Sequence, residues 1–176
     1  MKRFALILVA LAAASPALAQ GTAAAAAPGM VDTMRMSFEY AKGFIVSSAE
    51  QMPEANYSYK ATPAVRSFGQ IVAHVADANN GICSAVLGEA NPAPNIEKGK
   101  TAKADIVAAL KASYEYCGKA YKLADADTGA KLTLFGHEMT RAYALMINTT
   151  HNWEHYGNMV TYLRLNGQVP PSSKEM

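Results

Sequence analysis

Residues 150–167 read THNWEHYGNMVTYLRLNG, and they contain two of the four histidines of the chain, His151 and His155, four positions apart. An α-helix turns about 100° per residue, so both side chains leave from one stripe, with Cβ atoms about 5–6 Å apart. Two imidazoles at that separation can bind the same metal ion. The spacing is what a two-histidine metal clamp requires, but a polar stripe of this kind is either solvated or lines a site, so a third ligand is needed. The helix itself is predicted to end before Gly167.

The rest of the chain carries the signals of three more helices. Apolar side chains recur at steps of three and four residues from Val31 to Met52, and Pro53 ends that pattern. Ser67 and Gln70 match a capping box at the start of the next helix. An all-α four-helix bundle is therefore the predicted fold class. The predicted helices span residues 31–52, 67–88, 101–125 and 138–166.

Two connections between these helices differ in character. Residues 89–100, EANPAPNIEKGK, contain two prolines and a glycine, which predicts a long crossover, and Thr101 then offers an N-cap for the third helix. Residues 125–136, DADTGAKLTLFG, are interpreted as a plain connector, because no strand-like alternation of useful length occurs in the chain.

The two cysteines, Cys83 and Cys117, indicate one disulfide bond. A disulfide requires Cα atoms within about 7 Å of each other. Both cysteines lie near the C-terminal ends of their predicted helices, so they are level only if the second and third helices run parallel. The expected topology is therefore up, down, down, up, with the long crossover between helices two and three.

The N-terminal segment, MKRFALILVALAAASPALA, begins with two basic residues, continues with an apolar run and ends in small residues. This pattern predicts a signal peptide over residues 1–19, cleaved after Ala19, followed by a flexible leader over residues 20–29 and the bundle over residues 30–172. The apolar run is shorter than the roughly 20 residues that span a bilayer. We expect a periplasmic or secreted protein without a membrane segment after cleavage.

The net charge of the chain indicates whether nucleic acid is an expected partner. Signal cleavage would remove two of the 16 basic residues and none of the 14 acidic residues, which leaves a net charge of zero. A neutral chain gives no indication of nucleic-acid binding. We expect a small-molecule substrate, and the sequence leaves open whether the chain forms a homodimer.

A third metal ligand has to come from another helix. His74, in IVAHVADAN, lies on an apolar helix face, where a buried imidazole would leave a polar group unpaired. It is either a satisfied core residue or shares a metal ion with His151 and His155. His137, in FGHEM, is interpreted as a surface or capping residue. Cys83 lies about 180° around the helix from His74 and is interpreted as structural.

Two more polar residues share the stripe of His151 and His155. Glu154 can orient or deprotonate a water molecule, or it is a solvated acid on the helix flank. Asn158 either supports a metal-binding histidine from behind or makes a polar contact in the bundle. HNWEH also fits the inverted zinc-peptidase pattern H-x-x-E-H. A peptidase of that type needs a glutamate ligand far downstream of the motif, and after His155 the chain has only Glu175, in the tail.

Three segments together resemble the DinB/YfiT-like family of four-helix metalloproteins. They are PEANYSYKATPAVRS, VRSFGQIVAHVADAN and HNWEHYGNMVTYLRLNGQVPP, and the resemblance extends over residues 30–172. It implies an up-down-down-up bundle with one divalent ion held by three histidines, which here are His74, His151 and His155. Relatives in the wider superfamily include thiol-dependent transferases and isomerases, whereas export would separate this chain from the thiols of the cytosol.

These observations predict an exported metal-dependent enzyme of the hydrolase or transferase type. Three imidazoles leave positions on a metal ion open for water, which the ion acidifies. The alternative is a non-catalytic module that binds a metal ion or a small ligand. Imidazole ligands suit several divalent ions, of which zinc and nickel are expected first.

Overall fold

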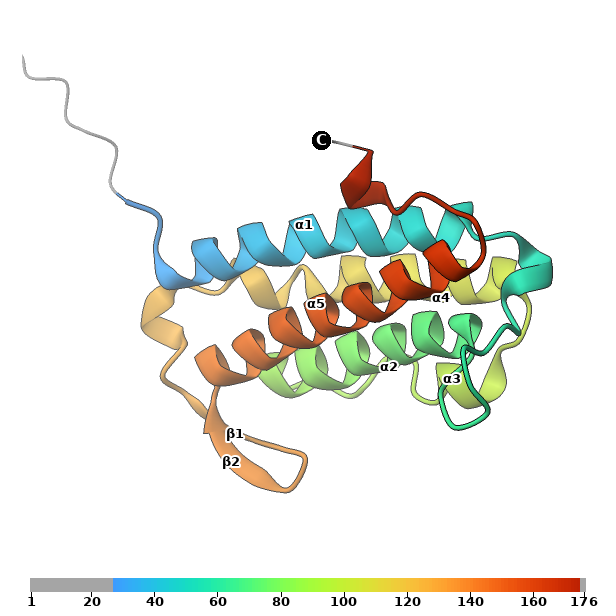
Figure 1. Cartoon of the computed structure of the whole chain (residues 1–176). Coiled ribbons are helices and arrows are strands. Elements are labelled where there is room, and N and C mark those ends of the chain that lie inside the picture. Colours follow the sequence, from blue (N-terminus) through green and yellow to red (C-terminus); the bar gives the residue numbers. More distant parts are fainter. Residues whose placement is uncertain (1–26, 175–176) are drawn as a thin grey trace, which may run out of the picture.

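A computed structural model describes residues 27–174. The predicted signal peptide, residues 1–19, and the leader as far as residue 26 lie outside the described residues. Most of the described chain is helical, which confirms the all-α class (Figure 1). The helices are α1 Met30–Gln51, α2 Phe68–Leu87, α3 Ile96–Gly99, α4 Lys103–Cys117 and α5 Arg141–Leu165, and the strands are β1 Lys131–Leu134 and β2 His137–Thr140. Single 3-10 turns lie at Glu54–Asn56, Ala120–Lys122, Asp125–Asp127 and Pro171–Ser173.

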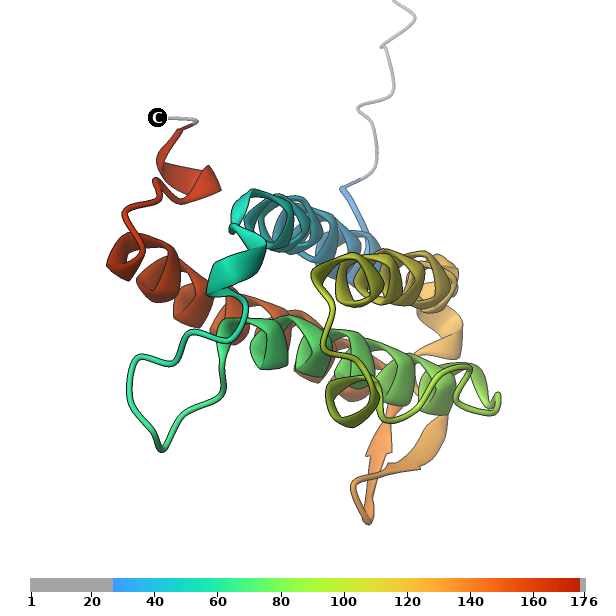
Figure 2. The ribbon, with the colours of Figure 1, turned by 90° about the vertical axis from the view of Figure 1, so that its right-hand side faces the viewer.

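The four long helices pack side by side around an apolar core. In Figure 1, α1 and α5 run from left to right, α2 and α4 run from right to left, and the chain returns along the bundle between α2 and α4. Figure 2 shows α2 beside both α4 and α5, with α1 across from it. The core draws on all four helices, for example Phe38, Val72, Tyr114 and Leu163, which are all fully buried. Within residues 27–174, the structure has no helix with the length and apolar character of a membrane span.

The start of α2 has the predicted capping box. The Ser67 hydroxyl accepts a hydrogen bond from the Gln70 N–H at 3.2 Å, and the Gln70 side chain accepts one from the Ser67 N–H at 2.9 Å. The prediction for the third helix was wrong at both ends. It begins at Lys103 with no side-chain cap, so Thr101 is not its N-cap, and it stops at Cys117.

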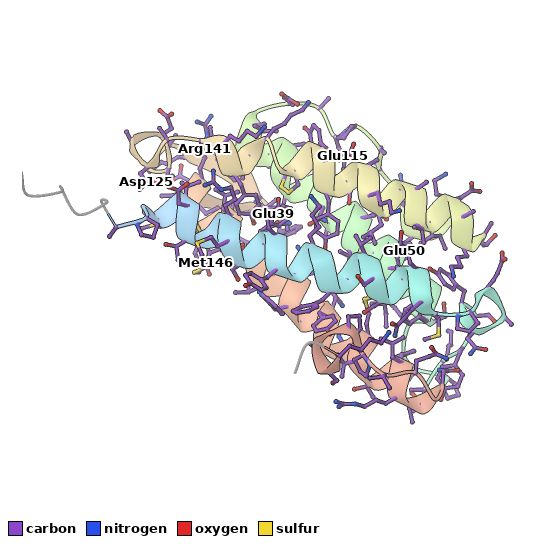
Figure 3. All side chains as sticks on the ribbon, turned by 90° about the horizontal axis from the view of Figure 1, so that it is seen from above. Glu39, Glu50, Glu115, Asp125, Arg141 and Met146 are labelled. Carbon is purple, nitrogen blue, oxygen red and sulfur yellow. A yellow bond between two sulfur atoms is a disulfide. The ribbon has the colours of Figure 1, made fainter. Side chains whose placement is uncertain are left out.

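After α4 ends at Cys117, the chain turns toward the start of α1, where Asp125 contacts that helix. Gly29 stands at the N-cap of α1 and has no side chain that could cap it. The Asp125 carboxylate instead accepts hydrogen bonds from the N–H groups of Met30 and Val31 at 3.0 and 2.9 Å. Figure 3 shows Asp125 at this end of α1. A carboxylate at a helix N-terminus is favoured by both the free N–H groups and the helix dipole.

A β-hairpin replaces the plain connector that the sequence predicted before the last helix. β1 and β2 pair antiparallel, with Leu134 opposite His137. The two residues between them, Phe135 and Gly136, have φ angles of 52° and 79°, as a type I′ turn requires. The last helix consequently starts at Arg141, where the Thr140 hydroxyl caps it, and not at residue 138.

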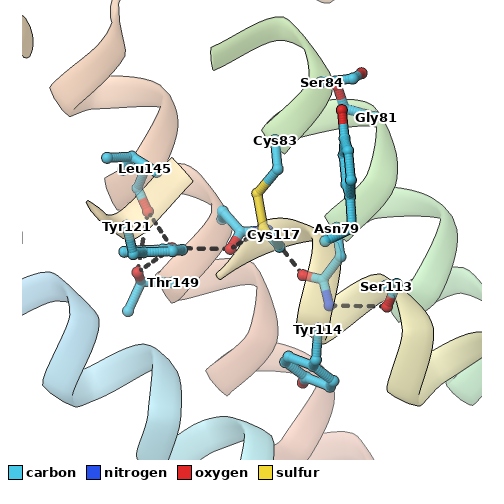
Figure 4. The surroundings of a disulfide bond; sticks show 12 residues. Asn79, Gly81, Cys83, Ser84, Ser113, Tyr114, Cys117, Tyr121, Leu145 and Thr149 are labelled. Atoms are coloured by element: carbon cyan, nitrogen blue, oxygen red, sulfur yellow. Dashed lines mark hydrogen bonds between the residues drawn. A yellow bond between two sulfur atoms is a disulfide. The ribbon is translucent and has the colours of Figure 1, made fainter. Parts of the chain in front are cut away.

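The Cys83–Cys117 disulfide joins α2 to α4, as predicted. Figure 4 shows the bond and its surroundings. The two Cα atoms are 5.2 Å apart, and both side chains are fully buried. The bond lies near the C-terminal end of both helices, which matches their common direction in Figure 1. It therefore ties together the two helices on either side of the long crossover.

A buried polar network continues from the disulfide into the centre of the bundle. The side-chain oxygen of Asn79 on α2 accepts hydrogen bonds from the side-chain amides of Asn148 and Asn152 on α5, at 2.8 and 3.0 Å. The Tyr121 and Tyr114 hydroxyls donate to the side-chain oxygens of Asn148 and Asn152, at 2.8 and 2.5 Å. All five side chains are fully buried, so each hydrogen bond forms away from water.

Removing the disulfide should lower the free energy of unfolding without removing a metal site elsewhere in the bundle. For the double variant Cys83→Ala/Cys117→Ala, we expect a loss of about 2 to 4 kcal/mol, because the bond restricts the unfolded chain. Urea unfolding of the oxidised wild type and the variant measures the difference. An unchanged free energy of unfolding, or loss of zinc binding by a variant that remains folded, would contradict this assignment.

Candidate metal centre

The three predicted metal ligands lie together between α2 and α5. His74 comes from the first half of α2, and His151 and His155 come from successive turns of α5. The Nε2 atom of His151 lies 3.2 Å from Nε2 of His74 and 3.0 Å from Nε2 of His155. One nitrogen from each ring lies within 4.8 Å of the others, an arrangement that can hold a metal ion.

The chemistry of these nitrogens fits a divalent cation. A neutral imidazole carries a proton on one nitrogen and a lone pair on the other. Lone pairs on three facing nitrogens repel one another unless a proton or a cation lies between them. Zinc binds imidazole nitrogens at about 2.0–2.1 Å, and nickel, copper and iron accept the same ligands.

Burial keeps two of the rings uncharged at neutral pH. Loss of solvent contact, together with positive charge on His155 and His74, lowers the pKa of His151 to about 4. Burial also lowers the pKa of His155 to about 4, together with positive charge on His74 and Arg66. Metal binding requires neutral imidazole. His151 and His155 are therefore in the ligating form at pH 7.

Glu97 on α3 orients the third ring, and the sequence analysis missed it. Its carboxylate accepts a hydrogen bond from His74 Nδ1 at 3.1 Å and one from Arg66 Nε at 2.9 Å. Because a carboxylate can only accept, the proton of the neutral His74 ring lies on Nδ1, and Nε2 is free to bind a metal ion. A carboxylate behind a ligating histidine both fixes the ring and makes it a stronger ligand.

Helix α3 is itself held by α2. The two oxygens of the Asp77 carboxylate accept hydrogen bonds from the N–H groups of Ile96 and Glu97, each at 2.8 Å. Asp77 lies three residues after His74, so one segment of α2 supplies both the ligand and the anchor of the acid that orients it. Asp77, in IVAHVADAN, was the sequence signal that could have indicated this contact. Aspartate is typical of helix N-caps, but Asp77 lies in the middle of a helix.

The remaining predicted site residues take different positions. The Asn158 amide nitrogen lies 3.5 Å from Nδ1 of His155, which places Asn158 directly behind that ring. Glu154 is exposed and forms no hydrogen bond with a described side chain. Nδ1 of His151 is buried and has no hydrogen-bond partner within residues 27–174. His137 is exposed on β2, before the start of α5.

The histidine cluster opens on one side into a cavity of about 570 Å³. His155, Glu154 and Asn158 line it from α5, and Arg66 and Glu97 line it from the segments that flank α2. The loop before α2 is tied to α5 here, because the Tyr162 hydroxyl donates to the Arg66 carbonyl oxygen at 2.6 Å. A small molecule in this cavity would lie against the His155 ring.

Comparisons with solved structures identify the same fold in two bacterial proteins. A DinB-like protein from Bacillus cereus superposes with a TM-score of 0.70 at 18% sequence identity, over 78% of this chain and 93% of that chain. A DinB-like protein from Bacillus subtilis superposes with a TM-score of 0.64 at 21% identity, with the same coverage of 78% and 93%. No curated protein matches the chain in sequence.

The sequence itself matches a family description over most of the bundle. Residues 44–159 match the DinB superfamily, a range that begins within α1 and includes His74, His151 and His155. The match covers more than half of the chain and agrees with the fold of the two Bacillus proteins. The chain belongs to the DinB superfamily.

Proposed function

We propose that this protein is an exported metal-dependent enzyme of the hydrolase or transferase type. One divalent ion, zinc or nickel, would be held by His74, His151 and His155. The observation that carries the proposal is the convergence of three Nε2 atoms in a cluster of which one ring, His155, lines an open cavity. Catalytic zinc sites typically use three protein ligands and leave a position for a substrate.

The residues of the chain have separate tasks in this proposal. When bound, the ion supplies a Lewis acid that polarises a carbonyl or phosphoryl oxygen and acidifies water. Glu97 holds the His74 ring in the ligating tautomer, and Asn158 supports the ring of His155. Glu154 lines the same cavity as His155 and is our candidate for the group that accepts a proton from the nucleophile.

The proposal of export rests on two features. The pattern of residues 1–19 is that of a signal peptide. The buried Cys83–Cys117 disulfide is compatible with an oxidising compartment such as the periplasm. A small-molecule substrate that reaches the cavity from outside the cytosol would follow from this location.

A non-catalytic metal-binding module is the second candidate. The observation that favours it is the exposed position of Glu154, which has no hydrogen bond that would hold its carboxylate toward the three rings. A protein that only binds a metal ion needs no positioned proton acceptor. The two candidates differ in whether the bound ion keeps a coordination position that exchanges with small molecules in the cavity.

Zinc affinity should depend on each ring and on the acid behind His74. We expect wild type, purified without a histidine tag, to bind about one ion per chain. His74→Ala, His151→Ala and His155→Ala should each weaken zinc binding by more than about 100-fold, and Glu97→Ala by about 10- to 100-fold. Competition with a fluorescent zinc chelator measures the affinities, and circular dichroism checks that each variant is folded.

His137→Ala is the matched control, because it removes an exposed histidine on the hairpin. Its zinc affinity should equal that of wild type. The proposal would be overturned by a wild-type protein that binds neither zinc nor nickel, or by equal losses of affinity in the His137 variant and the three ligand variants.

The metal-free protein should become less stable as the pH falls from about 6.5 toward 4. The folded pKa of His151 and of His155 is about 4, below the value of 6.5 in an unfolded chain. The unfolded state therefore binds more protons in this range, and stability rises with pH. Each ring contributes up to about 2 kcal/mol between pH 7 and pH 5, and its remaining contact with solvent reduces this, so urea unfolding should show a total loss of roughly 2 to 4 kcal/mol.

The double variant His151→Ala/His155→Ala tests the origin of this pH dependence. Most of the loss between pH 7 and pH 5 should disappear in the double variant, whereas His137→Ala should retain it. If the double variant loses as much stability as wild type over the same pH range, the buried rings are not its cause.

A further inference from the structure

A second and larger cavity shares two lining residues, Arg66 and Glu97, with the cavity beside His155, which is called the histidine cavity below. Its volume is about 750 Å³, and the basic residues that line it come from two segments of the chain. Lys60 and Arg66 come from the loop before α2, and Lys98 and Lys100 come from α3 and the residue after it. Segments that are more than 30 residues apart in sequence thus place four cations around one space.

The charge in this second cavity is unbalanced. Glu97 is the only acid among the residues that line it, against the four cations, and Glu97 is already paired with Arg66. Lys60, Lys98 and Lys100 form no ion pair with a described carboxylate within 4.0 Å. The histidine cavity has an excess of negative charge instead, because Glu97 and Glu154 line it together with one cation, Arg66. The excess of positive charge is therefore a local feature of the second cavity.

Neutral hydrogen-bond donors lie beside the lysines. Thr101 lines the same cavity, and its hydroxyl is not used as the cap of α4. Three lysines and a free hydroxyl offer hydrogen-bond donors without a matching carboxylate. Carboxylate and phosphate groups are the ligands that such a set of donors recognises, and partial enclosure by protein strengthens the attraction.

The Arg66–Glu97 ion pair joins the two cavities. Both residues line both of them, and the oxygen of Glu97 that does not accept from Arg66 accepts from the His74 ring. A molecule of sufficient length can therefore occupy the lysine-lined cavity at one end and lie against His155 at the other. The ion pair forms the boundary that such a molecule would cross.

We propose that the lysine-lined cavity binds a carboxylate or phosphate group of the substrate, whose reacting end lies at the three-histidine site. This inference rests on the proposed function and narrows its substrate class to organic anions. Lys60, Lys98 and Lys100 act in it as binding residues that select the substrate and take no part in the chemistry.

Succinate, methyl phosphate and uncharged succinamide are suitable probes. We would follow backbone amide signals of ¹⁵N-labelled protein during titration, with and without one equivalent of zinc. Succinate and methyl phosphate should cause saturable shifts at residues 58–60 and 97–101, and succinamide should cause none. In the triple variant Lys60→Gln/Lys98→Gln/Lys100→Gln, the affinity for both anions should fall at least tenfold.

The matched control is Lys42→Gln/Lys111→Gln/Lys131→Gln, which removes the same charge from lysines paired with surface acids elsewhere. Its anion affinity should stay within twofold of wild type. Equal weakening in both triple variants, or the absence of saturable shifts, would overturn the inference.

The comparison of titrations with and without zinc distinguishes a failure of this inference from a failure of the proposed function. Succinate binding that requires zinc and survives in the Lys60/Lys98/Lys100 variant would place the anion on the ion, which overturns the lysine cavity and leaves the metal site intact. Succinate binding at the lysines in a protein that takes up no zinc would uphold the anion site and overturn its link to a metal-dependent reaction.

Discussion

One buried hydrogen-bonded junction sets how α2 and α5 lie against each other. The side-chain oxygen of Asn79 accepts hydrogen bonds from two side-chain amides on the opposite helix, those of Asn148 and Asn152, and all three side chains are fully buried. A slide of either helix by one turn would leave buried polar groups without partners, at a cost of about 1–3 kcal/mol for each group. The position of His74 relative to the α5 histidines follows from this junction, because Asn79 and His74 belong to the same helix.

Two further contacts hold other helices against α2. The Cys83–Cys117 bond holds α4 to α2, so that the Tyr114 and Tyr121 hydroxyls reach the asparagines of α5. On the other side, Asp77 anchors α3 through two backbone N–H groups, and α3 presents Glu97 to His74. The three-histidine cluster thus lies on two packed helices. The loop before α2 and helix α3 both line the cavity beside His155 and the lysine-lined cavity.

Local and periodic features were predictable from the sequence, and so was the Cys83–Cys117 bond, because the chain has only two cysteines. The hairpin and the role of Glu97 were not. The capping box at Ser67, the helical periods and the shared stripe of His151 and His155 depend on residues three or four apart. The hairpin was missed because its strands have four residues each and its turn uses Phe135 at positive φ instead of the usual asparagine. Glu97 was missed because α3 is too short to show a period, and its cap comes from Asp77 on another helix.

The central claim is that three imidazoles hold one divalent ion with a position open to the cavity. The most direct test is visible absorption of the metal-free protein during titration with Co²⁺ and then with azide, since the d–d bands of cobalt report its coordination. We predict intense bands that saturate at about one Co²⁺ per chain and change when azide is added. A spectrum that remains that of Co²⁺ in buffer would contradict the metal site, and saturating bands that azide leaves unchanged would contradict the open position.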